Sequence, residues 1–188
     1  MLAWRMLPNA LTVLRMILVP PLVWLLLSGR HEAALAVALV AGISDALDGA
    51  LARGFGWQTR FGGIADPLAD KLLLVAAFLT LAWLGVLPAW LVGLVVLRDV
   101  VIVAGALVYH LRFGSVPASP TLLSKCNTGV QLLLVWAALL RLAEVPVPIR
   151  IVDGLVIGVA VLAVATLVQY VVVWSLRAAR VARERAGS

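Results

Sequence analysis

Four aspartates, Asp45, Asp48, Asp66 and Asp70, lie within 26 residues of an otherwise strongly apolar sequence. An ionisable side chain at the centre of a membrane-spanning helix costs roughly 2.5–3.5 kcal/mol even on insertion-based scales. Four carboxylates at this spacing therefore need a counter-charge that offsets both their burial and their mutual repulsion. Bound divalent cations supply it most simply, so a metal site is the first hypothesis.

The spacing of the aspartates is that of two helical pairs. On an α-helix, residues three or four apart lie on one face, about 5–6 Å apart at Cβ. Asp45 and Asp48 form one such pair, and Asp66 and Asp70 form the other. Facing carboxylate pairs suit Mg²⁺ or Mn²⁺ better than zinc. Two such ions about 3.5–4 Å apart can stabilise the attacking and leaving oxygens of phosphoryl transfer.

Small and basic residues follow the first pair. Gly49 and Ala52 would leave a trough for a base and a ribose, and Arg53 is placed to bind a phosphate bidentately. A different class of function is also open, because isolated intramembrane carboxylates often serve in ion or proton relays. The alternative is thus a small cation transporter. Transporters usually carry inverted repeats and broken helices at the midplane, whereas no internal repeat is visible in this sequence.

The composition is that of an integral membrane protein. The chain has 188 residues, of which 64% are hydrophobic and 13% charged, against about 45–50% and about 25% in soluble domains. This length fits one domain covering residues 1–188. We do not interpret the net charge of +6 as nucleic-acid binding, because no basic patch alternates with exposed aromatic residues. The single cysteine, Cys126, excludes an intrachain disulfide and a thiolate metal site.

The apolar stretches predict an all-α, polytopic fold with six transmembrane helices, since about 20 residues cross a bilayer. Glycine and proline clusters separate the stretches, and Pro20-Pro21 should kink the first. Tryptophans near the ends of the stretches are expected to anchor them at the membrane interface. The expected spans are Leu11–Leu27, Ala33–Ala52, Pro67–Leu84, Ala89–His110, Thr121–Leu140 and Ile151–Leu176.

The basic residues indicate the orientation. Six spans put both termini on one side, and the positive-inside rule places that side in the cytoplasm. The cytoplasmic set would be Arg5, Arg53, Arg60, Arg112, Lys125, Arg177, Arg180, Arg183 and Arg185, and the opposite set Arg30, Arg141 and Arg150. Both aspartate pairs would then lie near the cytoplasmic surface. The lack of a signal-peptide layout, with no room for a long transit peptide, favours a bacterial inner (plasma) membrane.

The aspartate segment resembles the signature of the CDP-alcohol phosphatidyltransferases at every position. In that family the acidic residues bind two divalent ions, which hold the diphosphate of a CDP-activated lipid, and the fourth acidic residue is the base. The resemblance implies that Asp45, Asp48 and Asp66 are metal ligands and that Asp70 is both ligand and catalytic base. It implies contacts with the CDP moiety by Gly49, Ala52, Arg53 and Thr59, and it implies a homodimer. The matching pattern is Asp45-x2-Asp48-Gly49-x2-Ala52-Arg53-x8-Gly62-x3-Asp66-x3-Asp70.

The first expected span begins Pro8-Asn9-Ala10-Leu11-Thr12. Asparagine is a good N-cap, which is an ordinary structural explanation. The segment also resembles the Pro-Asn-x2-Thr start of these enzymes, which lies against the nucleotide. We therefore assign Asn9 and Thr12 to the nucleotide site. Arg15, one turn further, is either an internal counter-ion or a side chain that snorkels outward.

Three residues are assigned to the acceptor alcohol, namely Arg98, Lys125 and Asn127. Neighbours on a helix do not face each other, so Arg98 and Asp99 are expected to have partners on other helices rather than simply each other. Arg98 is equally well explained as a structural counter-ion or as a contact to an anionic acceptor. Lys125 stands near a span end, where lysines usually snorkel. Its surroundings, Pro120 to Gln131, nevertheless resemble a segment of eukaryotic-type cardiolipin synthases.

The resemblance extends to the choice of acceptor. Phosphatidylglycerophosphate synthases tend to carry a second lysine where Asn127 stands and Arg-Glu where Arg98-Asp99 stands. Glycerol 3-phosphate is a near-dianionic monoester, whereas phosphatidylglycerol is a monoanionic diester that needs less positive charge. The expected reaction is therefore transfer from CDP-diacylglycerol to phosphatidylglycerol within the lipid membrane, giving cardiolipin and CMP. Glycerol 3-phosphate is the alternative acceptor, and His31 and His110 receive no role.

Overall fold

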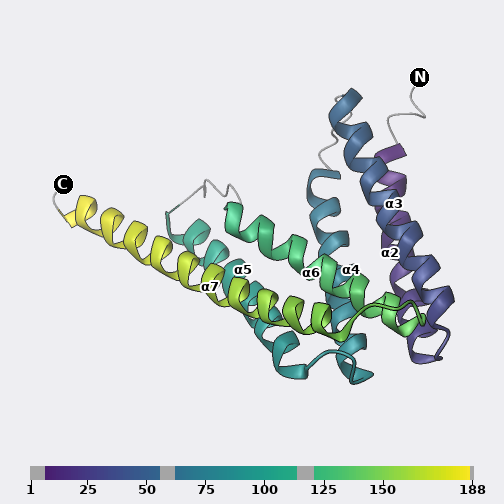
Figure 1. Cartoon of the computed structure of the whole chain (residues 1–188). Helices are drawn as coiled ribbons and strands as arrows, with labels where there is room; N and C mark the ends of the chain where they lie inside the picture. The colour runs from purple at the N-terminus through teal and green to yellow at the C-terminus, as the bar shows by residue number, and fades with distance from the viewer. Residues whose placement is uncertain (1–6, 56–61, 114–120, 187–188) are drawn as a thin grey trace. The chain divides into compact units, whose positions relative to one another are not determined.

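In the computed structural model, the described part of the chain forms six α-helices and no strand (Figure 1). The structure describes the backbone of residues 7–55, 62–113 and 121–186, and the side chains of these ranges except 7–11, 45–46, 48–55, 62–68, 70, 109–110, 112–113 and 175–186. The helices are α2 Leu7–Leu27, α3 His31–Phe55, α4 Gly62–Trp83, α5 Ala89–Phe113, α6 Leu122–Leu142 and α7 Ile149–Ala186.

Each expected span coincides with one of these helices, so the all-α fold is confirmed. Three helices contain described stretches that are long and apolar enough to cross a membrane, at Ala89–Val108, Leu122–Leu142 and Ile149–Trp174. In α2, α3 and α4 the described apolar stretches are shorter, at Thr12–Leu27, His31–Ser44 and Lys71–Trp83. These three helices continue into turns whose side chains lie outside the described residues. Six spans and cytoplasmic termini therefore remain predictions.

The chain divides into two compact units, the first formed by residues 1–87 and 135–147. In this unit α2 contacts both α3 and α4. Helix α3 contributes Ala34, Ala38 and Ala41, all buried and spaced four and three residues apart. Such small side chains on one face let membrane helices approach closely. The buried residues of α2 recur with helical period along one stripe: Thr12, Arg15, Val19, Leu22 and Leu26.

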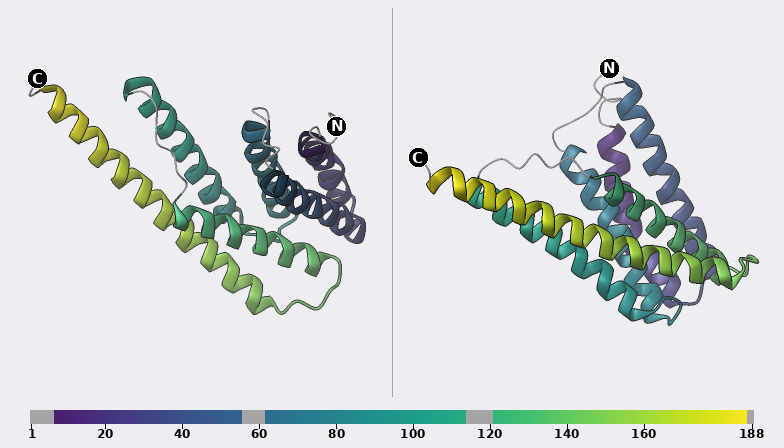
Figure 2. Two further views of the ribbon diagram at one scale, coloured as in Figure 1. Left: turned by 90° about the horizontal axis from the view of Figure 1, so that it is seen from above. Right: turned by 60° about the vertical axis from the view of Figure 1, so that its left-hand side comes forward.

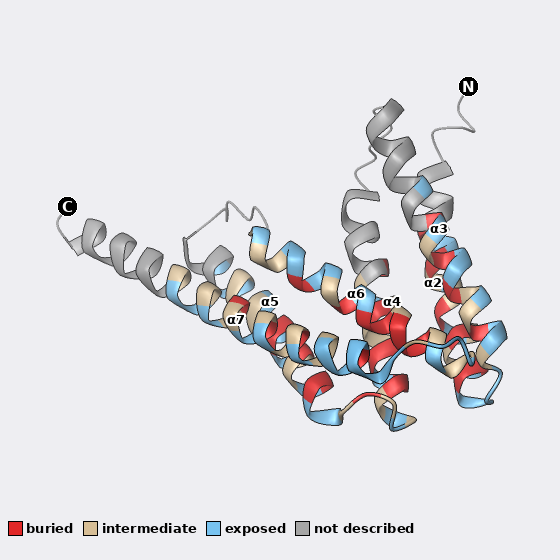
Figure 3. Cartoon of the chain, viewed as in Figure 1, coloured by how far each residue is buried: buried red, intermediate tan, exposed pale blue. Residues whose placement is uncertain are grey.

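The second unit comprises residues 88–134 and 148–188, in which α5 contacts α7 (Figure 2). Buried and exposed positions alternate with helical period along both helices (Figure 3). Gly105 of α5 lies so close to Trp174 of α7 that a Cβ at position 105 would overlap the indole ring. Tyr170 meets the same indole edge-on, with ring centroids 6.0 Å apart. The absence of a side chain at Gly105 is therefore what admits Trp174.

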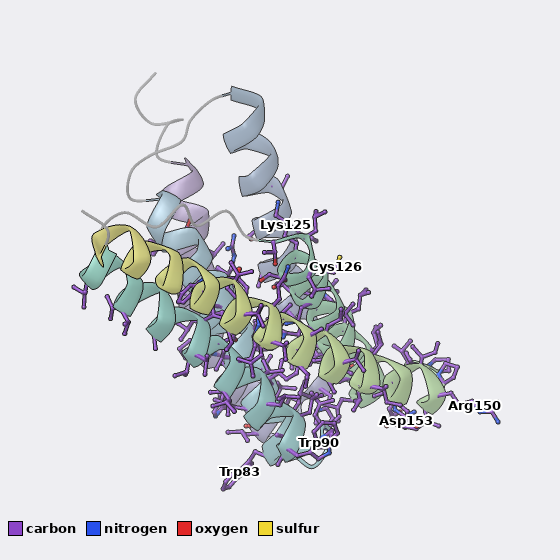
Figure 4. All side chains as sticks on the ribbon, turned by 90° about the vertical axis from the view of Figure 1, so that its left-hand side faces the viewer. Trp83, Trp90, Lys125, Cys126, Arg150 and Asp153 are labelled. Atoms are coloured by element: carbon purple, nitrogen blue, oxygen red, sulfur yellow. The ribbon has the colours of Figure 1, made fainter. Side chains whose placement is uncertain are left out.

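Two tryptophans that were expected to be interface anchors have a role in helix packing. Trp174 rests on Gly105, and Trp136 of α6 rests on Gly42 of α3, where a Cβ would lie 3.2 Å from its ring. Both side chains are half-buried. By contrast, Trp24 and Trp83 are exposed, and Figure 4 shows Trp83 projecting from the end of α4. Helix contacts thus explain the two half-buried indoles, while the exposed ones retain the predicted anchoring role.

Three helices end with the same backbone geometry. Gly29 after α2 and Gly85 after α4 have positive φ angles of 71° and 72°. The N–H groups of Arg30 and Val86 then donate to carbonyls five residues back. This is the hydrogen bond of a Schellman ending, which satisfies carbonyls that the helix leaves unpaired. Glu144 after α6 adopts the same conformation, with φ 62°, although it is not glycine.

Candidate functional site

The backbone is helical at all four aspartates. Asp45 and Asp48 lie in α3, and Asp66 and Asp70 lie in the first turns of α4. Because both helices run unbroken through these positions, each pair lies on one helical face, as the spacing predicted. Helix α2 contacts both α3 and α4, so one unit holds both pairs. The four carboxylate groups lie outside the described side chains, and their role as metal ligands remains a prediction.

The expected nucleotide contacts are distributed over the same unit. Gly49, Ala52 and Arg53 follow the first aspartate pair in α3, and Asn9 lies in the first turn of α2. Their side chains, and all of Thr59, lie outside the described residues. Among the side chains that are described, no three possible metal ligands form a group; the aspartates are not in that set. Sequence pattern and helix placement therefore define this part of the site.

Two polar residues of α2 are deeply buried beside the aspartate helices. Thr12 has 0% and Arg15 has 1% of its surface exposed. At three residues apart they share one helical face. Because the Arg15 side chain is buried within the unit rather than extended along its surface, the structure favours the internal counter-ion over the snorkelling side chain. Thr12 is buried in the unit that carries the nucleotide motif, and its contact with the nucleotide stays a prediction.

In the second unit, Arg98 is the centre of a polar cluster that connects three helices. Its Nη1 donates to Oδ1 of Asp99 at 2.7 Å. Its Nη2 donates to Oγ of Ser124 in α6 at 2.7 Å, and its Nε donates to Oγ1 of Thr166 in α7 at 3.1 Å. Only 4% of the Arg98 surface is exposed. The guanidinium therefore holds α5 to both α6 and α7.

This cluster partly corrects the expectation for Arg98 and Asp99. The two residues do form a direct ion pair, because the long arginine side chain can fold back toward a neighbour that points elsewhere on the helix. The expected partners on other helices are present for Arg98, in α6 and α7. Three of the five guanidinium N–H groups are engaged within the protein. The contacts favour the structural explanation of Arg98 and leave two N–H groups for a ligand.

The other two expected acceptor contacts have different environments. Lys125 is exposed on the first turn of α6, next to the exposed Cys126 (Figure 4). Asn127 is completely buried. Ser124, which accepts the hydrogen bond from Arg98, immediately precedes Lys125. Arg98 therefore contacts the first turn of α6 at the residue that directly precedes Lys125.

The sequence patterns did not point to Gln131 or Thr166. Gln131 is 1% exposed and lies four residues after Asn127, on the same face of α6. The polar Asn127-x3-Gln131 spacing in an apolar helix was the signal available. Thr166 is a lone threonine in α7, and its hydroxyl also donates to the Leu162 carbonyl at 2.7 Å. Such back-bonding threonines are common in membrane helices, so its role as a partner of Arg98 had no signal in the sequence.

A cavity of about 450 Å³ lies in the first unit at the other end of α3. It is lined by residues 29–33 and 142–144, among them His31. With a rise of 1.5 Å per residue, this end of α3 is about 20 Å along the helix from Asp45. The cavity is therefore separate from the aspartate segment.

Most of the chain matches the model of a single protein family. Residues 5–174 match the family model described as CDP-alcohol phosphatidyltransferase. Over 150 residues the chain is 37% identical to a probable cardiolipin synthase (CMP-forming) of Drosophila melanogaster, covering 70% of this chain and 46% of that protein. The cardiolipin synthase (CMP-forming) of Homo sapiens is 34% identical over 150 residues, with 49% of it covered. The chain thus spans about half the length of these two relatives.

A second group of relatives carries another name. A probable phosphatidylglycerophosphate synthase of Mycobacterium tuberculosis is 37% identical over 172 residues, covering 88% of this chain and 79% of that protein. Identity to the two groups is therefore similar, while the second match extends over more of both chains.

Proposed function

The chain belongs to the CDP-alcohol phosphatidyltransferase family, and we propose that it transfers the phosphatidyl group of CDP-diacylglycerol to an alcohol and releases CMP. The observation that carries this proposal is the complete aspartate motif, distributed over two continuous helices that both contact α2. In the reaction an acceptor oxygen bonds to the lipid-linked phosphorus, the bond from that phosphorus to CMP breaks, and CMP leaves. CMP release from CDP-diacylglycerol by the purified chain tests the proposal and separates it from cation transport.

We assign two divalent cations, Mg²⁺ or Mn²⁺, to Asp45, Asp48, Asp66 and Asp70. The donor set fits such ions, because each aspartate pair lies on one face of a continuous helix and offers only hard oxygen ligands. When bound, the ions would neutralise the diphosphate and the charge that develops on departing CMP. The aspartates would hold them, and Arg53, five residues after Asp48, would bind a phosphate.

The other motif residues would bind the nucleotide and move the proton. Gly49 and Ala52 would leave room for the ribose and base, and Asn9, Thr12 and Thr59 would complete the contacts. Asp70 would accept the proton of the attacking acceptor hydroxyl. Asp70→Asn should then reduce the single-turnover rate much more than CDP-diacylglycerol binding, because three carboxylates remain to hold metal. A variant that turns over normally and binds poorly would reverse this assignment.

The proposed acceptor is phosphatidylglycerol, which would give cardiolipin. Two features of the acceptor region support it: position 127 is a neutral asparagine, and the charge of Arg98 is already paired with Asp99. Lys125 then remains the exposed cation at the start of α6, which suits a phosphodiester. Glycerol 3-phosphate is the second candidate, because the match to the Mycobacterium tuberculosis protein extends over more of both chains.

A product assay with both acceptors present distinguishes the two candidates. We expect cardiolipin, and we expect Asn127→Lys to weaken its synthesis, because a close charge pair is worth about 1–4 kcal/mol depending on the local dielectric. Formation of phosphatidylglycerophosphate without cardiolipin by the unaltered chain would select glycerol 3-phosphate.

The site is proposed to open to the cytoplasm of a bacterial inner (plasma) membrane, in a multi-pass chain that forms a homodimer. The excess of basic residues on the side of the aspartates supports this orientation. Single cysteines at Gly56 and Leu142, in a Cys126→Ala background, test it in oriented vesicles. A membrane-impermeant reagent added on the cytoplasmic side should label position 56 and spare position 142; the reverse pattern would overturn the orientation.

A further inference from the structure

Two amide side chains of α6 are buried without hydrogen-bond partners. Asn127 and Gln131 have 0% and 1% of their surface exposed. Within the part of the chain that the structure describes, Nδ2 and Oδ1 of Asn127 and Nε2 of Gln131 have no partner. A buried polar atom left in this state costs about 1–3 kcal/mol. These three atoms therefore need a hydrogen-bonding group that the described part of the protein does not supply.

The two amides continue a row that begins at the Arg98 cluster. Ser124, Asn127 and Gln131 are spaced three and four residues apart, so they lie on one face of α6. Ser124 accepts a hydrogen bond from Arg98 at 2.7 Å. Along this face, the polar groups change within about two helical turns from the Arg98 cation and its hydroxyl partners to neutral amides. A ligand that follows the row would carry an anionic group at one end and an uncharged polar group at the other.

We propose that Asn127 and Gln131 bind the secondary hydroxyl of the acceptor's glycerol phosphate unit, with Gln131 as a new specificity-determining residue. This inference rests on the proposed function. A hydroxyl both donates and accepts, which matches Oδ1 of Asn127 as acceptor and the two amide NH₂ groups as donors. Phosphatidylglycerol and glycerol 3-phosphate both carry this non-reacting hydroxyl. An amide cannot remove a proton from it, so the pair would select the acceptor without activating the wrong oxygen.

The test compares acceptors that differ only in the secondary hydroxyl. Phosphatidylglycerol is compared with phosphatidyl-1,3-propanediol, and glycerol 3-phosphate with 3-hydroxypropyl phosphate. Within the acceptor pair that the unaltered chain uses, we expect kcat/KM to be about 10–100-fold higher for the acceptor that carries the secondary hydroxyl. An acceptor without this hydroxyl would leave the amides unpaired. Gln131→Met should remove most of this preference while leaving the KM for CDP-diacylglycerol unchanged. The two pairs show which acceptor supplies the hydroxyl.

A matched variant separates recognition from structural support. Gln169→Met makes the same change in α7, where the Gln169 side chain accepts a hydrogen bond from Thr121 at 3.2 Å, and should keep the full preference. Gln131→Met should unfold no more easily than the unaltered chain, because it replaces unpaired polar atoms by apolar ones. Should that variant fail to fold, Gln131→Asn, whose amide is one methylene shorter, should show a reduced preference.

The outcomes are distinguishable. Absence of CMP release with every acceptor would reject the proposed function, and this inference with it. Normal turnover with equal kcat/KM for both members of each pair would overturn the inference alone, and would leave water as the partner of the amides. Retention of the full preference by Gln131→Met would overturn it as well.

Discussion

Charged residues are arranged differently in the two units. In the second unit Arg98 is matched inside the protein by Asp99, Ser124 and Thr166. In the first unit, the four aspartates of α3 and α4 accompany a core made largely of alanine and leucine, with Arg15 buried in α2. A charge that is paired within the protein can hold helices together, while closely spaced carboxylates of like charge favour the binding of a cation. The Arg98 cluster therefore supports the structure, and we propose that the four aspartates bind cations.

The largest expected effect follows from the cluster of four aspartates in the first unit. Asp45→Asn, Asp48→Asn or Asp66→Asn should reduce CMP release by about 10³-fold or more, because each removes a ligand of ions that stabilise several kcal/mol of charge in the transition state. The folded protein should remain, and relief of repulsion could raise its thermal stability. Asp153→Asn, at an exposed position in the first turns of α7 (Figure 4), is the matched control and should change little. Full turnover in chelator, with metal removal verified, would contradict this prediction.

The next largest effect concerns the polar cluster around Arg98 in the second unit. Arg98→Met should lower the free energy of unfolding by about 3–5 kcal/mol, because it leaves the buried Asp99 without this cation and removes the bonds to α6 and α7. Adding Asp99→Leu should recover part of the loss. Unfolding in detergent measures both, and Arg150→Met, at an exposed position of α7, should stay within about 0.5 kcal/mol of the unaltered chain. Unchanged stability with a raised acceptor KM would instead make Arg98 a ligand contact.

A smaller effect is expected where α5 meets α7. Gly105→Ala should destabilise the second unit by about 1–3 kcal/mol, because the new methyl group overlaps the Trp174 ring and forces the helices to shift. Gly93→Ala, in the same helix with open space around it, is the control; it should be neutral or stabilising by up to about 1 kcal/mol. Equal effects of the two substitutions on thermal unfolding would show that Trp174 does not pack on this glycine.

The smallest effect concerns the matching contact in the first unit. A Cβ at Gly42 would lie 3.2 Å from Cζ2 of Trp136, which the ring can relieve by moving a few tenths of an ångström. Gly42→Ala should therefore cost less than about 1 kcal/mol, since the gain in helix propensity offsets part of the strain. Thermal unfolding of Gly42→Ala and Gly105→Ala in parallel ranks the two contacts. A larger loss for Gly42→Ala would reverse the ranking.

The helices could be predicted from sequence because long apolar stretches, separated by glycine and proline, allow few other structures in a membrane. The aspartate motif could be found because its spacing matches a helical face in both α3 and α4. The partners of Arg98 could not, since they depend on how three helices meet and on how a flexible side chain folds back. The deep burial of Asn127 and Gln131 could not be predicted either, because hydropathy does not show which face of α6 is covered.

Helix α7 continues to Ala186, well past Leu176, after which the sequence becomes rich in arginine. An unbroken helix transmits orientation, so a soluble domain joined to this segment without a flexible linker would be held in a fixed direction. Each residue added or removed at the junction would rotate that domain by about 100° and shift it by 1.5 Å. A short series of such fusions would attach rigid domains to this 20.0 kDa chain, each in a different orientation, as markers for single-particle imaging.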